Sequence, residues 1–207
     1  SAASDTTTTS CWCKKAHCDC STTAARNSST TAWGSFVDSV QSKGWGELHI
    51  HSNPLCDDAL QAYGAGFVEG VLTSKQIAQH HQSFMQATFG GNDSAIVFPE
   101  AKSFVEANDA YMSSLTNSTD DRWWHHAGLV WGQLDGLMEG YNSVAPKKLA
   151  RLDFLLMNAV VDLSSIQGAG RKTVGDKEKG RRARPKTSAE IVLDIPVQAQ
   201  FFDAFLQ

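Results

Sequence analysis

Four of the five cysteines in this 207-residue chain lie within the ten-residue segment CWCKKAHCDC, and this cluster is the strongest local constraint on the fold. Cysteine alternates with other residues on both sides of the Lys14–His17 centre, which is typical of two short strands joined by a turn. We expect a hairpin with disulfides among these cysteines. The spacing of the cysteines does not determine which of them pair. The disulfide candidates are Cys11, Cys13, Cys18 and Cys20.

Zinc is the alternative use of the same side chains, because thiolates and the imidazole of His17 are donors that zinc accepts. Structural zinc sites usually space their cysteines as C-x2-C, whereas both pairs here are C-x-C. Disulfides are therefore favoured, and no metal or cofactor is predicted. Cys56 stands apart, and we expect it to be a buried free thiol.

The compartment follows from three Asn-x-Ser/Thr patterns, which begin at Asn27, Asn92 and Asn117. Each pattern arises easily by chance, but all three lie in polar, turn-like stretches of a chain with clustered cysteines. The net charge of −4 argues against nucleic-acid binding, and no apolar run approaches the roughly 18 residues of a membrane span. We expect a glycoprotein of the secretory pathway, secreted or lysosomal.

The first third of the chain predicts a polar leader followed by short elements. Residues 1–31 form a leader with the Cys-rich hairpin, and residues 1–10 of it are expected to be loose. Four apolar residues then recur at helical spacing and predict a short helix that ends at Gly44: Trp33, Phe36, Val37 and Val40.

The segment GWGELHIHSNP predicts a strand with one buried face. Leu48 and Ile50 point to one side, and Glu47, His49 and His51 point to the other. The two histidines have a spacing that metal sites use, but a polar row against solvent or a covering helix is the favoured interpretation.

From Pro54 onward, the spacing of apolar residues predicts helices. Thr73 with Gln76 forms a capping-box pattern, and Gly90-Gly91 should end the helix that it starts. The predicted helices begin at Asp57 or Asp58, Thr73, Pro99, Asp120 or Asp121, and Pro146. The adjacent pairs His80-His81 and His125-His126 point about 100° apart within their helices and cannot chelate one ion together. An interfacial or pH-responsive role is expected for them.

The first of these helices carries a stripe of small residues, Ala62, Gly66 and Gly70. Glycine inside a helix costs up to ~1 kcal/mol relative to alanine, so the stripe indicates a close approach of another backbone. Glu69 lies on the same helix and is expected to be capped or exposed. Its functional alternative is a partly buried carboxylate with an arginine partner or a raised pKa.

Residues 168–186 contain eight lysines and arginines against two acidic residues and are expected to form a flexible basic linker open to proteases. The linker lacks aromatic residues on which bases could stack, which argues against nucleic-acid binding. Residues 187–207 predict a strand and a terminal apolar helix, so we expect the chain to be incomplete or docked on a partner. Trp124 and Trp131 have helical spacing and are expected in the core, with a lipid-binding surface that also includes Trp123 as the alternative.

The run GWGELHIHSNPLCDDALQAYGAGFVEGVLTSKQIAQHH resembles the hallmark segment of the phospholipase B-like family, in which a Gly-Trp-Gly turn precedes a strand, an Asn and an acidic position. Weaker likenesses at Trp123–Tyr141 and in LDFLLMNAVVDL extend the resemblance over 32–167. The matching residues are Gly44, Trp45, Gly46, Asn53, Asp57 or Asp58, Gln61, Ala62, Tyr63, Ala65, Gly66, Val68, Glu69, Gly70, Leu72 and Thr73.

The resemblance implies an α+β fold, namely the helix-rich N-terminal portion of an αββα N-terminal-nucleophile hydrolase sandwich. It implies a precursor cut into two fragments that stay together, with the nucleophile, usually Cys, first in the C-terminal fragment. The expected reaction deacylates phospholipids or cleaves related amides through an acyl-enzyme. The implied partners are the C-terminal fragment and a lipid or amide substrate, with contact to a membrane surface and a homo-oligomer or larger assembly left open.

The sequence departs from the family at the nucleophile, because Lys186-Thr187-Ser188 stands where a cysteine is expected. Thr187 is the candidate catalytic residue, since an N-terminal threonine can serve in this superfamily. The alternatives are a threonine that merely starts a strand in an inactive homologue, and a nucleophile beyond Gln207. The second functional hypothesis is therefore a non-catalytic secreted glycoprotein with a structural or binding role.

Overall fold

A computed structural model of the chain describes residues 6–14, 17–23, 25–90, 99–116, 121–160, 162–163 and 165–166. The described residues form an α+β fold, as predicted. The elements in order are β1 (Thr6–Lys14), β2 (His17–Ser21), β3 (Ala32–Val37), α1 (Val40–Lys43), β4 (Glu47–Ser52), α2 (Asp58–Leu72), α3 (Ser74–Phe89), α4 (Pro99–Leu115), α5 (Arg122–Val144) and α6 (Arg151–Asn158).

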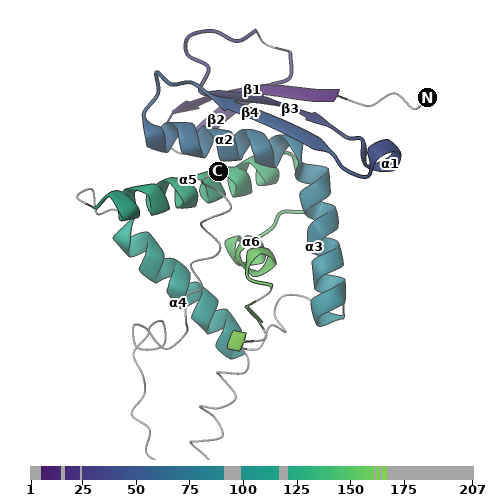
Figure 1. The fold of residues 1–207 in the computed structure, drawn as a ribbon, viewed down its shortest axis with the longest axis vertical. Coiled ribbons are helices and arrows are strands. Elements are labelled where there is room, and N and C mark those ends of the chain that lie inside the picture. The colour runs from purple at the N-terminus through teal and green to yellow at the C-terminus, as the bar shows by residue number, and fades with distance from the viewer. Residues whose placement is uncertain are drawn as a thin grey trace, which may run out of the picture.

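The elements are arranged in layers, with the sheet on one side and the helices on the other (Figure 1). The sheet has the strand order β2-β1-β3-β4, and every neighbouring pair is antiparallel. Helix α2 lies against one face of the sheet, α5 lies along the far side of α2, and α3, α4 and α6 lie beyond (Figure 1). Within the described ranges no helix covers the other face, which we call the outer face.

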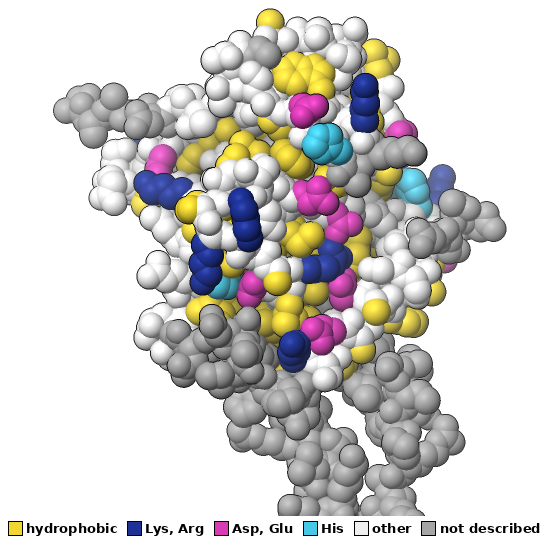
Figure 2. Space-filling model, turned by 180° about the vertical axis from the view of Figure 1, so that it is seen from behind, with side chains coloured by type: hydrophobic (Ala, Val, Ile, Leu, Met, Phe, Trp, Pro, Cys, Tyr) yellow, Lys and Arg dark blue, Asp and Glu magenta, His cyan; other side chains and the backbone are white. Residues whose placement is uncertain are grey.

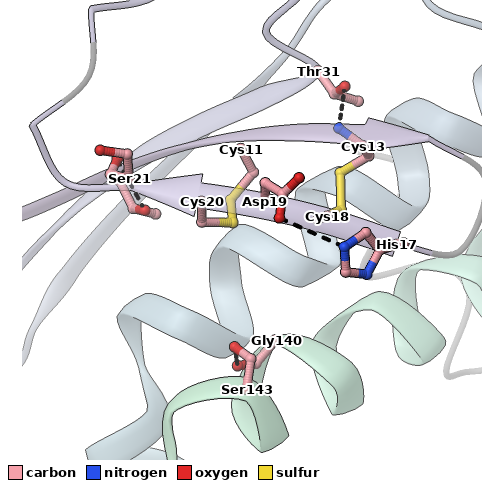
Figure 3. Close-up of a disulfide and its surroundings, with 11 residues drawn as sticks. Cys11, Cys13, His17, Cys18, Asp19, Cys20, Ser21, Thr31, Gly140 and Ser143 are labelled. Atoms are coloured by element: carbon pink, nitrogen blue, oxygen red, sulfur yellow. Dashed lines mark hydrogen bonds and ion pairs between the residues drawn. A yellow bond between two sulfur atoms is a disulfide. The ribbon is translucent and has the colours of Figure 1, made fainter.

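The predicted hairpin is present, and its register settles the pairing of the cysteines. Cys11 lies opposite Cys20 and Cys13 opposite Cys18, and each pair forms a disulfide between β1 and β2 (Figure 3). The zinc alternative is therefore wrong, because all four sulfurs are in S–S bonds. Cys56 is a free thiol and is only half-buried.

The leader prediction is wrong for Thr6–Ser10, which belong to β1. This stretch pairs with β3, from Thr6 opposite Val37 to Cys11 opposite Ala32. The helix expected around Trp33 is wrong as well, because Ala32–Val37 is a strand between β1 and β4. Only Val40–Lys43 is helical, and Gly44 ends it with φ of 89°, as expected.

The small-residue stripe has the predicted role. A Cβ atom on Gly66 would overlap the carbonyl of Gln133, and one on Gly70 would overlap the carbonyl of Leu137. Helix α5 carries the matching glycines Gly136 and Gly140. A Cβ atom added to Gly136 would overlap the carbonyl of Tyr63, and one added to Gly140 would overlap the carbonyl of Phe67. The two helices therefore touch backbone to backbone, which the glycines alone permit.

Helix starts agree with the sequence in part. Asp57 caps α2 by accepting from the N–H of Leu60 (2.7 Å), α4 begins at Pro99, and Asp121 caps α5. Gly90 ends α3 in the left-handed conformation, as expected.

Thr73 is the N-cap of α3, as expected, but one predicted capping box and one predicted helix start are wrong. The capping box of α3 does not form, because the Thr73 hydroxyl donates to the Glu69 carbonyl (2.8 Å) and the Gln76 amide donates to Asp38 (3.2 Å). The last helix begins at Arg151 rather than at Pro146. Asp153 accepts from the backbone N–H of Ala150 (2.8 Å) and thereby fixes that start.

Electrostatic contacts join the outlying helices. Arg151 of α6 donates from Nε to Asp109 of α4 (2.7 Å) and from Nη1 to Asp135 of α5. Trp131 also donates to Asp109 (2.9 Å), and the hydrogen bond from Arg151 is the main reason that the pKa of Asp109 is lowered. Seen from behind, apolar side chains reach the surface of this helical part among charged ones (Figure 2).

Candidate ligand site on the outer face of the sheet

The strand register places two rows of polar side chains on the outer face. Ser10 pairs with Trp33, and Trp33 pairs with His51. Thr8 pairs with Ser35, and Ser35 in turn pairs with His49, which forms a parallel row. Paired residues in adjacent strands share a face, so each row stands together on the side away from α2.

The alternate residues of β3, which point to the opposite face, confirm which side of the sheet is the outer one. Ala32, Gly34 and Phe36 are buried, and a Cβ on Gly34 would contact Val68 and Leu72 of α2. The outer face of β3 is thus free to carry larger and more polar side chains.

The loop between β2 and β3 folds back over the outer face. The guanidinium carbon of Arg26 lies 5.2 Å from the ring centroid of Trp33. The His51 ring stacks on the same tryptophan, with centroids 5.6 Å apart and planes 17° apart. Trp33 therefore contacts both a permanent cation and an imidazole.

A buried asparagine anchors this loop. The Asn53 amide donates to the carbonyls of Thr30 (2.9 Å) and Ser28 (3.2 Å), and Asn53 Oδ1 accepts from the N–H of Leu55 (3.0 Å). The backbone N–H of Thr31 also donates to the Cys11 carbonyl (2.9 Å). The loop is thus tied both to β1 and to the turn after β4.

Loop and sheet together enclose an open hollow of about 640 Å³. Its lining combines hydroxyl groups with apolar surface, and among the described lining residues Arg26 and His51 are ionisable. The lining residues are Thr8, Thr9, Ser10, Thr22, Ala25, Arg26, Trp33, Gly34, Ser35 and His51. Hydroxyl groups, a guanidinium and an aromatic ring are groups that hold a polar, anionic ligand.

The predicted site residues are only partly within the described structure. His51 contributes to the hollow, and His49 stands in the next row. Asn27 lies exposed in the loop over the outer face. Thr187, Asn92, Asn117 and the basic linker lie outside the described residues.

Two contributors were not found by sequence reasoning. Arg26 belongs to no motif, and its place follows only from the fold of the loop. The apolar spacing predicts a helix at Trp33, so it gives no signal for the stacking of this side chain on His51. Asn53 was noted in the family segment, but its anchoring role needed the structure.

The members of the pair His80-His81 diverge as predicted. His80 is exposed while His81 is buried, with its Nε2 atom 3.4 Å from Asp153 Oδ1. His125 lies 3.4 Å from Asp58, between the starts of α5 and α2. In the part of the chain that the structure describes, no group of three or more His, Cys, Asp or Glu side chains could hold a metal ion.

Glu69 is half-buried beside α5. It is therefore the partly buried carboxylate with a raised pKa, not the capped or exposed one that the sequence favours. Burial is the main cause of the raised pKa of its carboxyl, and a hydrogen bond to Gln133 opposes the rise. The folded state therefore favours the neutral carboxyl more than the unfolded state does. Its contribution to stability is fully present below the ordinary carboxyl pKa and is lost as the pH rises through the folded-state value.

We therefore expect Glu69→Gln to flatten the dependence of stability on pH. The variant keeps an amide next to Gln133 and removes the charge, so it should gain stability at pH 7 relative to wild type and little at pH 4. Urea unfolding at the two pH values measures this. The exposed carboxylate of Glu106 is the control, since Glu106→Gln should leave the difference between the two pH values unchanged. A Glu69→Gln variant destabilised at pH 7 would contradict the expectation.

None of the helices described is both long enough and apolar enough to cross a bilayer. The sheet, its two disulfides and the glycine-paired helices α2 and α5 define a disulfide-bonded α+β unit with a polar hollow on one face of its sheet.

Comparison with known proteins names the family. The Phospholipase B family model matches residues 32–192. "Phospholipase B-like protein B" of Dictyostelium discoideum is 28% identical over 159 residues, 75% of this chain and 27% of that protein. "Putative phospholipase B-like 2" of Rattus norvegicus is 31% identical over 149 residues, with 69% and 26% covered. "Phospholipase B" of Crotalus adamanteus is 31% identical over 143 residues, with 65% and 25% covered.

The chain belongs to the phospholipase B family, a family of hydrolase type. It spans about a quarter of the length of the curated relatives that it matches.

Proposed function

We propose that this chain is the N-terminal part of a phospholipase B-type hydrolase that cleaves acyl esters of phospholipids, or related amides. The family match over residues 32–192 is the observation that carries this proposal. Because the matched part is only about a quarter of each relative, we take the partner to be the C-terminal fragment of the same precursor. A sheet with α2 on one face and a helix-free outer face is consistent with one half of an αββα sandwich.

The proposed chemistry runs through an acyl-enzyme, with Thr187 as the candidate nucleophile. Cleavage of the 186–187 peptide bond would free the α-amine of Thr187, whose ordinary pKa near 8 suits a general base. This amine takes the hydroxyl proton while Oγ attacks the acyl carbonyl, and it returns the proton to the departing alcohol or amine. Water then adds to the acyl-threonine ester and releases the fatty acid.

Maturation of the full-length precursor tests this scheme. Intact mass and N-terminal sequencing under reducing conditions should show a second fragment that begins with Thr187. Thr187→Ala should leave the precursor uncut, whereas Ser188→Ala, one position further on, should be cut normally. An uncut wild-type chain would contradict the scheme and favour the alternative function, a non-catalytic secreted glycoprotein with a structural or binding role. A fragment beginning at another Cys, Ser or Thr would move the nucleophile there.

The secretory pathway is proposed as the route of this protein, secreted or lysosomal. Two disulfides in a hairpin support an oxidising compartment. The side chain of Asn27 has the exposure that an N-glycosylation site needs. Asn27 is exposed, and its Oδ1 accepts from the Ser29 hydroxyl (2.6 Å) and from the indole N–H of Trp12 (3.3 Å).

We expect the protein made in a secretory host to carry a glycan on Asn27. Asn27→Gln and Ser29→Ala should each lower the intact mass by the same single glycan. Ser28→Ala changes the middle position, which the acceptor pattern leaves free, and should keep that glycan. Identical masses for wild type and Asn27→Gln, after correction for the substitution, would show that the site is not used.

A further inference from the structure

Strand β4 is an edge of the sheet that has none of the usual protection of a free edge. It pairs with β3 through six consecutive residues without a bulge, from Glu47 opposite Val37 to Ser52 opposite Ala32. Within the described ranges no strand lies on its other side. The strand contains no proline and no lysine, and the side chains that it directs toward α2 are uncharged. A regular edge of this kind is a place where a further strand can pair.

The core beneath the sheet is incompletely covered along the same edge. The buried residues of this core come from β1, β2, β3 and α2, and none of them comes from β4. Leu48 and Ile50 point toward α2 as well, yet both are only half-buried. Leu60 and Val71 of α2 belong to the same core and are also only partly buried. Apolar cover is therefore missing next to the open edge.

A segment near the end of the sequence has the pattern that this edge requires. Ile191, Leu193 and Ile195 are apolar at alternate positions, in the part of the chain that is predicted to be a strand and lies outside the described residues. On a strand, these three side chains share one face. If that face is turned toward α2, the apolar side chains cover Leu48 and Ile50.

The same orientation is favourable on the outer face. Asp194 then points to the side of the sheet on which β4 carries His49 and His51. A carboxylate and imidazoles on adjacent strands are a favourable cross-strand combination. The segment therefore matches β4 on both faces.

Pro196 fixes which backbone groups of the segment would face β4. Proline has no N–H and is tolerated in a strand only where that group would point away from the paired neighbour. Successive residues direct their N–H groups to opposite sides of a strand. The N–H groups of Ile191, Leu193 and Ile195 would therefore point toward β4.

We propose that residues 191–197 add a strand to the sheet beside β4, with Ile191, Leu193 and Ile195 directed toward α2. Residues 167–190, which connect this segment to the described structure, can span up to ~3.3 Å each and are long enough to reach the sheet. The pairing does not require hydrolase activity. If the 186–187 bond is cleaved, however, the same pairing holds the two fragments together.

Cysteine pairs in the full-length protein test the position of the segment. In a Cys56→Ala background, His49→Cys is combined with cysteine at each position from 190 to 197 in turn. An even-numbered position should form a disulfide with His49→Cys, because both side chains lie on the outer face, and its odd-numbered neighbours should not. His80→Cys, exposed on α3, is the matched control and should crosslink with none of them. Peptide mass spectrometry identifies each bridge.

Three results would overturn the proposal. The first is the absence of a bridge at every position, and the second is bridging at odd-numbered positions alone. The third is a bridge that always joins two copies of the chain, which would show that the edge pairs with another molecule.

Hydrogen exchange of the full-length protein tests the hydrogen bonds themselves. Leu193→Pro removes an N–H that faces β4 and should speed exchange of the β4 amides about tenfold or more. Val192→Pro removes an N–H that points away from β4 and should change their exchange much less. Equal exchange of the β4 amides in the two variants would contradict the pairing.

These experiments also separate the added strand from the proposed function, because neither readout depends on catalysis. Bridges from His49→Cys in a protein that is never cut and releases no fatty acid would support the strand and refute the hydrolase. A cut protein that releases fatty acid but forms no such bridge would refute the strand and leave the hydrolase.

Discussion

Substituting valine for Gly66 or Gly140 is expected to lower the free energy of unfolding by at least about 3 kcal/mol, the largest effect of any single change considered for this protein. Both glycines lie where α2 and α5 touch, and a Cβ on either would overlap a backbone carbonyl of the other helix. A backbone carbonyl cannot rotate away as the end of a long side chain can. The helices would have to separate, and the packing around the contact would be lost.

Gly132 provides the matched control within α5. A Cβ there would meet nothing within 4 Å. Gly132→Ala should therefore be neutral or stabilise by up to about 1 kcal/mol through helix propensity. Urea unfolding of the full-length protein measures all three variants. Equal stabilities for Gly66→Val and Gly132→Ala would refute the backbone-to-backbone contact.

Removal of the Cys11–Cys20 disulfide is the second large effect. The bridge closes a short loop with a sequence separation of 9, and the chain-entropy relation gives about 2–3 kcal/mol for such a loop. Cys11 is fully buried between the sheet and α2, so alanine is a better replacement than serine, which would bury a hydroxyl. The double variant Cys11→Ala/Cys20→Ala should be destabilised by about that amount.

Cys56→Ala is the control for cysteine removal, because Cys56 is not bridged. It should change stability much less than the double variant. Thermal unfolding without reductant, and again with reductant, tests the assignment. If reductant lowers the midpoint of the Cys11→Ala/Cys20→Ala variant as much as that of wild type, the Cys11–Cys20 bridge is not the stabilising one.

Local patterns predicted those parts of the fold that local chemistry dictates. The Cys-x-Cys alternation predicts the hairpin, and Asp57 and Asp121 are among the helix caps that the sequence predicts. Gly66 and Gly70 indicate a close contact with another helix. For the hairpin and the caps, the signal and its structural cause lie within a few residues of each other. The two glycines indicate only that a close contact exists, because their partner α5 is far away in the sequence.

Strand β3 shows where local patterns fail. Its six residues are too few to separate a helical period from an alternating one, and the spacing of Trp33 and Phe36 fits one face of a helix although the strand places them on opposite faces. The decision comes from β1 and β4, which pair with it from distant parts of the sequence. The strand character of Thr6–Ser10 has the same origin, since its partner is β3.

The candidate site was still less predictable. Arg26, Trp33 and His51 come from a loop and two strands, and only the sheet register and the folded loop bring them together. The pairing of Arg151 with Asp109 and Asp135 likewise joins three helices. No spacing along the chain encodes such contacts.

The central claim is that this chain supplies part of a phospholipase B-type hydrolase, and fatty-acid release tests it most directly. The full-length mature protein is incubated with phosphatidylcholine, and free fatty acid and glycerophosphocholine are quantified by mass spectrometry, with Thr187→Ala alongside. The account predicts that wild type releases both products and that Thr187→Ala loses at least about a thousandfold in rate. Processed wild-type protein that releases no fatty acid from any phospholipid offered would contradict the claim.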